Sequence, residues 1–181
     1  MRILNAFVTA SFSVALLLPG SASTLAATPP DAPEALRPPE DQVLALEARA
    51  TGVQIYECSA SQGEPPHFEW VFKAPEAELS DRTGRKVGKH YAGPTWESTD
   101  GSSVVGETKA RADGPEPTAI PWLLLSAKSN AGTGVFSQIK SIQRLQTVGG
   151  KAPSAPCTRD NAHQVARIPY KAVYYFYAGK Q

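Results

Sequence analysis

The chain has 181 residues, with 18 Lys and Arg side chains against 17 Asp and Glu, and a formal net charge of +1. Binding to nucleic acid or to an anionic membrane needs a basic excess, so neither is expected as a partner. The length is that of a single domain.

The first 27 residues have the composition of a secretory signal peptide. Arg2 precedes an apolar run, Ala6–Leu18, which is followed by a Pro-Gly break and then by small residues. The run is shorter than the roughly 20 apolar residues that span a bilayer, so cleavage between Ser23 and Ala27 is expected rather than retention as an anchor. We therefore assign residues 1–26 to a signal peptide. The mature chain, without a membrane segment, is predicted to be exported, either periplasmic or extracellular.

Residues 27–39 are predicted to be a proline-rich extended leader, followed by one all-β domain over residues 40–181. Five prolines lie between positions 29 and 39, and proline disfavours both helix interiors and strand pairing. Residues 41–50 suit either a helix or a strand. We favour a strand, because a turn signal and a clear strand follow directly.

Two early segments, Val53–Cys58 and His67–Lys73, alternate in the way that strands do. The second places Phe68, Trp70 and Phe72 on one face. Because a row of large aromatic side chains is costly to expose, we expect this row to be buried.

Asp100 and Gly101 form the signature of a two-residue hairpin turn. In that register, Trp96 pairs with Val105. Because successive side chains of a strand point to opposite faces, Trp96 and Glu97 must face opposite sides of the sheet.

Three later strands are predicted: Ile120–Ala127, Val135–Thr147 and Val165–Tyr177. The first is a continuous apolar run, typical of a buried strand, and the last is rich in tyrosine. The middle segment has an irregular apolar spacing that suits a strand with a bulge. Its basic residues Lys140 and Arg144 are expected on a solvated face.

The predicted elements indicate one fold class. Residues 74–79 are compatible with a single helical turn, and the proline-containing residues 109–119 with a surface loop. Everything else reads as seven to nine short strands joined by glycine and proline turns. The pattern predicts an all-β, single-domain antiparallel sandwich or barrel.

The chain contains two cysteines, Cys58 and Cys157. In an exported protein, an even pair is expected to form a disulfide, here one that closes most of the domain. The alternative is a catalytic thiol acting with His90 or His163. Export favours the oxidised pair.

The densest group of chemically useful residues lies in Val87–Gly106. It contains His90, Tyr91, Trp96 and Glu97, which we take as candidate ligand-binding residues. Polar and aromatic residues on turns held by a rigid sheet are a common setting for recognition.

These residues allow two kinds of chemistry. His90 and Glu97 would serve as acid and base if they shared a cleft, and His67, His90 and His163 would bind a metal if they converged. The histidines have no short ligand spacing, and no motif signals a nucleophile. We therefore assign no catalytic residue, no metal and no cofactor.

Several motifs together resemble an exported family of unknown function, DUF3455, from bacteria and fungi. They occur in the same order over nearly the whole mature chain: Gly52–Cys58, Trp70–Ala77, Gly88–Glu97, Pro121–Ala127, Gln143–Arg144, Thr147–Pro153 and Cys157. The resemblance implies no established activity and no site residues.

Some fungal members of that family carry a malate dehydrogenase label, which the residues here do not support. The only Gly-x-Gly sequence is Gly132–Gly134. It lacks the third glycine, the following helix and the acidic residue of a dinucleotide-binding unit. A turn between two strands explains it.

We expect the protein to bind a ligand, a glycan or a protein of the cell envelope or exterior rather than to catalyse a reaction. The alternatives are an enzyme using the chemistry above and a structural or inhibitory protein of the envelope. Trp96, Trp122 and the tyrosines of the last strand are expected to form core and barrel lining, with a groove for sugar or peptide as the alternative.

Overall fold

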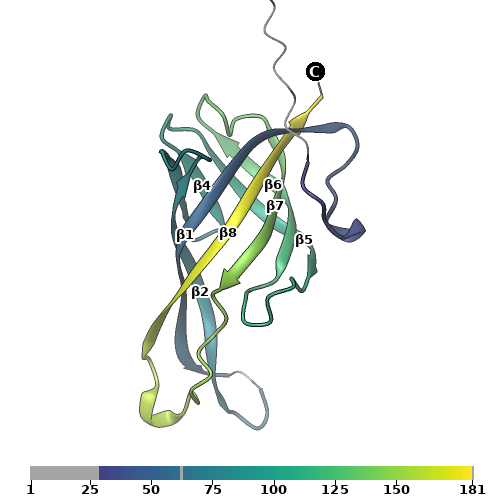
Figure 1. Ribbon diagram of the computed structural model, residues 1–181. Coiled ribbons are helices and arrows are strands. Elements are labelled where there is room, and N and C mark those ends of the chain that lie inside the picture. Colours follow the sequence, from purple (N-terminus) through teal and green to yellow (C-terminus); the bar gives the residue numbers. More distant parts are fainter. Residues whose placement is uncertain (1–28, 62, 181) are drawn as a thin grey trace, which may run out of the picture.

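The computed structural model describes residues 29–61 and 63–180, so the predicted signal peptide lies outside the described residues. Eight antiparallel strands follow one another and close into a barrel (Figure 1). The elements are η1 (Glu34–Leu36), β1 (Gln42–Ala60), β2 (Phe68–Ser80), β3 (Lys86–Tyr91), β4 (Thr95–Ser98), β5 (Ser103–Ala112), β6 (Trp122–Ala131), β7 (Ile139–Gly149), η2 (Arg159–Asn161) and β8 (Val165–Gly179).

The predicted fold class is confirmed, and of the two architectures the fold is a barrel. Each strand pairs with its neighbours in the chain, and β1 pairs with β8 to close the ring. Among the described residues, no helix has the length and apolarity needed to cross a membrane.

The inside of the barrel is filled largely by aromatic and aliphatic side chains. Trp96 is fully buried, with its ring edge-on to those of Tyr174 and Phe176 at centroid distances of 5.3 and 6.1 Å. Gly106, two residues beyond the pairing partner of Trp96, leaves room for the indole, since a Cβ there would lie 2.9 Å from it. Trp96 thus belongs to the inner core, which agrees with the expectation that it forms core and barrel lining.

The segment before β1 packs on the outer wall of the barrel. Leu36 is fully buried in a second cluster with side chains of β7 and β8. Its carbonyl accepts a hydrogen bond from Gln143 Nε2 (2.5 Å), and Gln143 Oε1 accepts one from Tyr177 (2.5 Å). Residues 29–39, expected to be an extended leader, thus include a 3₁₀ turn and form a docked strap, which hides apolar wall surface from water.

Three strands, β1, β2 and β8, run past the barrel as an extension (Figure 1). The pairing of β2 with β3 begins only at Ala77, whereas its pairing with β1 continues to Phe68. At this end, the predicted disulfide between Cys58 and Cys157 joins β1 to the loop before β8. The bridge fastens that loop to the extension.

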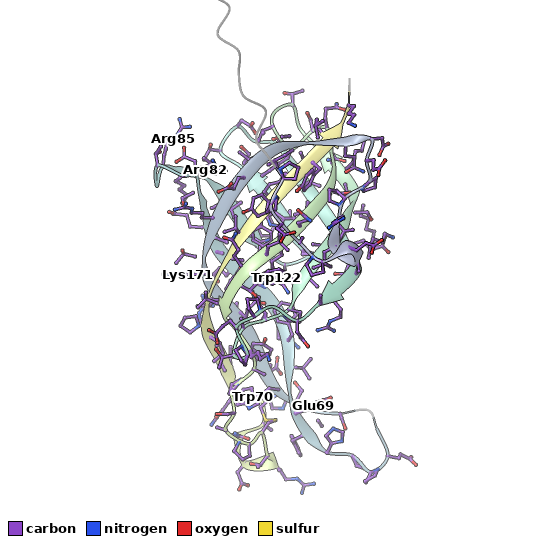
Figure 2. All side chains as sticks on the ribbon, turned by 45° about the vertical axis from the view of Figure 1, so that its right-hand side comes forward. Glu69, Trp70, Arg82, Arg85, Trp122 and Lys171 are labelled. Carbon is purple, nitrogen blue, oxygen red and sulfur yellow. A yellow bond between two sulfur atoms is a disulfide. The ribbon has the colours of Figure 1, made fainter. Side chains whose placement is uncertain are left out.

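The aromatic row of β2 is not buried as predicted. Trp70 lies on the extension (Figure 2), and its Nε1 donates to the carbonyl of Ala155 at 2.9 Å. Phe68 is partly exposed, and Phe72 is 49% exposed. Phe68 and Trp70 lie beyond the paired ring of strands, and Phe72 lies at the end of the barrel, where it is only half covered.

Two segments that were expected to lie outside strands belong to strands in the structure. Residues 74–79 continue β2, with Ala77 and Leu79 buried between exposed glutamates, and residues 109–112 continue β5. In both cases pairing with a neighbouring strand overrides weak local preference.

The β4–β5 hairpin is shifted by one residue from the predicted register. Trp96 pairs with Val104, because three residues, not two, form the loop. Gly101 has φ 86°, and Ser98 N donates to Ser102 O, which is the three-residue loop with a left-handed glycine. The prediction that Trp96 and Glu97 face opposite sides is confirmed, since Trp96 is buried inside the barrel and Glu97 lies on its outer surface.

Candidate functional site

The four predicted site residues divide between the two faces of the barrel wall. His90 and Trp96, opposite each other on β3 and β4, point into the barrel, while Tyr91 and Glu97 point outward. The structure does not bring His90 and Glu97 into one cleft, which the acid–base hypothesis requires.

The outward pair forms a small polar cluster on the surface. Tyr91 donates a hydrogen bond to Glu97 at 2.8 Å, and Lys89 Nζ lies 3.1 Å from the same carboxylate. The bond from Tyr91, together with Lys89, lowers the pKa of Glu97, and the same bond raises the pKa of Tyr91. Such exposed pairs contribute little to stability or to a site.

The inward pair is part of the barrel lining. The rings of His90 and Trp96 are stacked, with centroids 4.3 Å apart and planes 10° from parallel. His90 Nδ1 lies 2.8 Å from the carbonyl of Thr95, and because a carbonyl only accepts, Nδ1 carries the ring proton. Burial lowers the pKa of His90 to about 3, so the ring is neutral and Nε2 is an acceptor.

The three histidines lie in different surroundings. His67 Nδ1 lies 2.9 Å from Ser61 Oγ, His163 Nδ1 lies 3.4 Å from Glu57 Oε1, and His90 is inside the barrel. Among the described residues, no group of three or more His, Cys, Asp or Glu side chains is placed to hold a metal ion.

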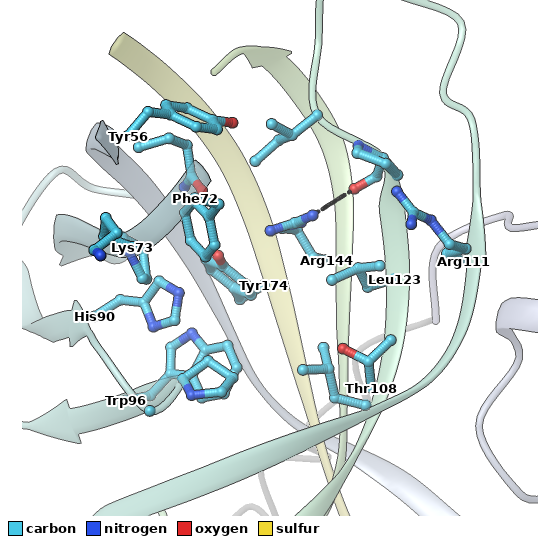
Figure 3. A pocket seen from close by; sticks show the side chains of 17 residues that line it. Tyr56, Phe72, Lys73, His90, Trp96, Thr108, Arg111, Leu123, Arg144 and Tyr174 are labelled. Atoms are coloured by element: carbon cyan, nitrogen blue, oxygen red, sulfur yellow. Dashed lines mark hydrogen bonds between the residues drawn. The ribbon is translucent and has the colours of Figure 1, made fainter. Parts of the chain in front are cut away.

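A cavity of about 590 Å³ lies at the end of the barrel from which the extension leaves, since Tyr56 and Phe72, at the start of the extension, line it. Figure 3 shows its lining side chains. One side is aromatic and the other is mainly aliphatic. The aromatic side consists of Tyr56, Phe72, His90, Trp96 and Tyr174, and the facing side includes Thr108, Ile120, Leu123 and Leu125. Its size and lining are those of a small-molecule site.

Arg144 points into this cavity between the two sides (Figure 3). Its Nε and Nη2 donate to the carbonyl of Pro121 at 3.1 and 2.8 Å. A guanidinium has five N–H donors, so three remain for other partners. The expectation of a solvated strand face is correct for Lys140, which is exposed, but wrong for Arg144.

The described lining of the cavity is basic. It contains Lys73, Arg111 and Arg144 and no acidic residue. Lys73 pairs with Glu57 at 3.2 Å, whereas no carboxylate of the described residues forms an ion pair with either arginine. The cavity therefore carries positive charge inside an apolar wall.

Several polar atoms beside the cavity lack a partner within the described chain. They are Gln54 Nε2, Trp96 Nε1 and Tyr174 Oη, all buried on lining residues, and Tyr170 Oη next to them. Tyr170 lies close to Gln54 and Tyr174 without forming a well-aligned hydrogen bond with either. Burial raises the pKa of Tyr174, so its hydroxyl stays protonated. Because buried polar groups usually have a partner, these atoms are open to hydrogen bonds from water or a ligand in the cavity.

Of the predicted candidates, His90 and Trp96 line the cavity, and Tyr91 and Glu97 do not. Sequence reasoning did not assign Arg144, Tyr174 or Gln54 to a site, although Gln54 and Arg144 lie in motifs that carry the family resemblance. A further signal was position: Arg144 lies two residues after Ile142 and therefore shares its inward face. Trp122 lies away from the cavity, in the cluster under the strap.

Residues 38–178 match the model of a family described as "Protein of unknown function (DUF3455)". No curated protein and no solved structure gives a significant match to the chain.

Proposed function

The chain belongs to the DUF3455 family, whose description assigns no activity, and we propose that it is a binding protein that holds a small organic molecule in the end of its barrel. The observation that carries the proposal is the cavity of about 590 Å³, lined by an aromatic side and an aliphatic side with one inward-pointing guanidinium. Eight-stranded barrels are just wide enough to hold one small ligand.

The cavity favours a small molecule over a protein or a glycan as the ligand. The barrel is closed all round by strand pairing, so a ligand enters only through the end, past exposed residues such as Phe72 and Thr108. A folded protein does not fit a cavity of this size. A glycan chain is less suited, because its hydroxyl groups would face walls with few polar atoms.

Export is part of the proposal. The signal-like leader and the disulfide between Cys58 and Cys157 support it, because disulfides persist in oxidising compartments. The ligand would be met in the periplasm or outside the cell.

A fluorescent probe tests the proposal directly. Phenylnaphthylamine is neutral and apolar, and its emission rises in an apolar site. We expect the purified protein to bind it, and Thr108→Trp, which places an indole at the cavity wall, to weaken binding at least tenfold. The matched control is Lys109→Trp, since Lys109 is exposed, adjacent in sequence and not part of the lining. Equal binding by both variants would refute the barrel end as the site.

A further inference from the structure

We infer that the ligand is an organic acid with a single carboxylate and a flat or slender apolar body, and that Arg144 binds its carboxylate. The inference rests on the proposed function and names the class of molecule that the cavity takes. Arg144 is the anchor because it is the one basic lining residue that reaches in between the two walls (Figure 3), whereas Lys73 and Arg111 are exposed.

The donors of Arg144 are arranged for a carboxylate. The bonds from Nε and Nη2 to the Pro121 carbonyl fix the plane of the guanidinium. Both Nη1 protons and the second Nη2 proton remain. One Nη1 proton and the remaining Nη2 proton point the same way and form the fork that a carboxylate accepts with two oxygens. Pro121, directly before β6, thus positions the anchor without neutralising it.

Charge balance in the cavity favours a ligand with a single negative charge. No described carboxylate pairs with Arg144, and the described lining contains no acidic residue. An unpaired charge next to apolar walls is unfavourable, and an incoming anion compensates it in surroundings of low dielectric. Of the two arginines in the described lining, Arg144 lies between the walls and Arg111 is exposed. A monoanion therefore balances the inner charge, whereas a phosphate dianion would retain one uncompensated charge.

The two walls of the cavity determine the shape of the ligand's apolar body. Rings on one side face aliphatic side chains on the other, so a flat aromatic or slender aliphatic body packs between them. Deeper in, the neutral His90 presents Nε2 as an acceptor. That end of the cavity therefore disfavours a second carboxylate.

The experiment compares matched acids and amides by isothermal titration calorimetry. The probes are cinnamate with cinnamamide, and decanoate with decanamide, in low salt at neutral pH; phenyl phosphate is the dianion control. We expect an acid to bind about tenfold or more tightly than its amide, as expected for a hydrogen-bonded charge, and phenyl phosphate to bind more weakly than cinnamate.

The variants assign the effect to one side chain. Arg144→Met should weaken acid binding about tenfold or more and leave amide binding within about twofold. Amide binding also reports that the cavity is intact in the variant. Lys140→Met is the matched control, because Lys140 lies on the same strand and is exposed, and it should bind like the wild type.

The outcomes separate the two proposals. If an amide binds as tightly as its acid, and Thr108→Trp abolishes both, the cavity binds ligands but the acid class is wrong. Equal weakening of acid and amide by Arg144→Met overturns the role of Arg144 as anchor. If no probe binds, or if Thr108→Trp leaves binding unchanged, the proposed function fails as well. The acid-to-amide ratio of the wild type decides the class even if Arg144→Met does not fold.

Discussion

Histidine 90 should make the barrel sensitive to mild acid. The ring is 2% exposed, stacked on Trp96, and faced by Tyr174 and by the positive charge of Arg144. Burial is the main reason that its pKa falls from an ordinary 6.5 to about 3. Between these two pH values the unfolded chain takes up a proton at His90 that the folded chain does not. The free energy of unfolding is therefore at its full value above pH 6.5 and declines as the pH falls toward 3.

The size of the effect follows from the shift. Each pH unit in this window lowers the free energy of unfolding by roughly 1.4 kcal/mol when the folded state excludes the proton. From pH 6.5 to pH 4.5 the loss is about 2–3 kcal/mol, a large part of the 5–15 kcal/mol typical of a domain. The carboxyl groups with lowered pKa values, such as Asp81 and Asp100 at about 2, lose their contributions at lower pH.

The assay is urea unfolding at pH 7.5, 6.5, 5.5 and 4.5 with the disulfide intact. His90→Asn keeps an N–H donor near the position of Nδ1 and removes the titrating ring. It should cost about 1–3 kcal/mol at neutral pH through lost packing, but flatten the decline toward pH 4.5. His163→Asn is the control, because His163 is exposed and has φ 66°, a conformation that asparagine tolerates. A wild-type stability that is flat across the window, or an equal decline in His90→Asn, would refute the reasoning.

Two predictions concern the disulfide and the strap. The double variant Cys58→Ser, Cys157→Ser should lose about 4–5 kcal/mol in urea unfolding, because the bridge spans 99 residues; reductant should lower the Tm of the wild type alone, and a loss below about 1 kcal/mol would contradict this. Leu36→Ala should lose about 2–4 kcal/mol, because Leu36 is fully buried under the strap. The exposed Glu34→Ala in the same turn should change little, and equal stability of both variants would show that the strap does not pack.

Much of the fold could be predicted because alternation is a local signal. The strands around Val53–Cys58 and Val165–Tyr177, the opposite facing of Trp96 and Glu97, and the disulfide all followed from nearby residues and composition. The irregular spacing of β7 is also explained. Its register shifts between Ile139 and Ser141, so that Ile139 and Ile142 both lie in the inner core.

The site could not be predicted, because barrel closure brings its residues together. Gln54, Arg144 and Tyr174 come from β1, β7 and β8, and they meet only when the first and last strands pair. The predicted site residues, by contrast, are neighbours in the sequence, and adjacent residues of a strand point to opposite faces of the sheet. The aromatic row of β2 failed for a related reason: alternation shows a shared face but not whether another wall covers it.

The pairing of β1 with β8 also sets the order in which the protein matures. A chain that crosses a membrane with its N-terminus leading can form the hairpins from β1 to β7 as they emerge, since these join sequence neighbours. The ring, and with it the cavity, exists only after Val165–Gly179 has arrived and paired with Gln42–Glu57. Until then β1 and β7 are open edges that attract other strands. Pairing of this last strand with β1 therefore removes both open edges and completes the cavity in one step.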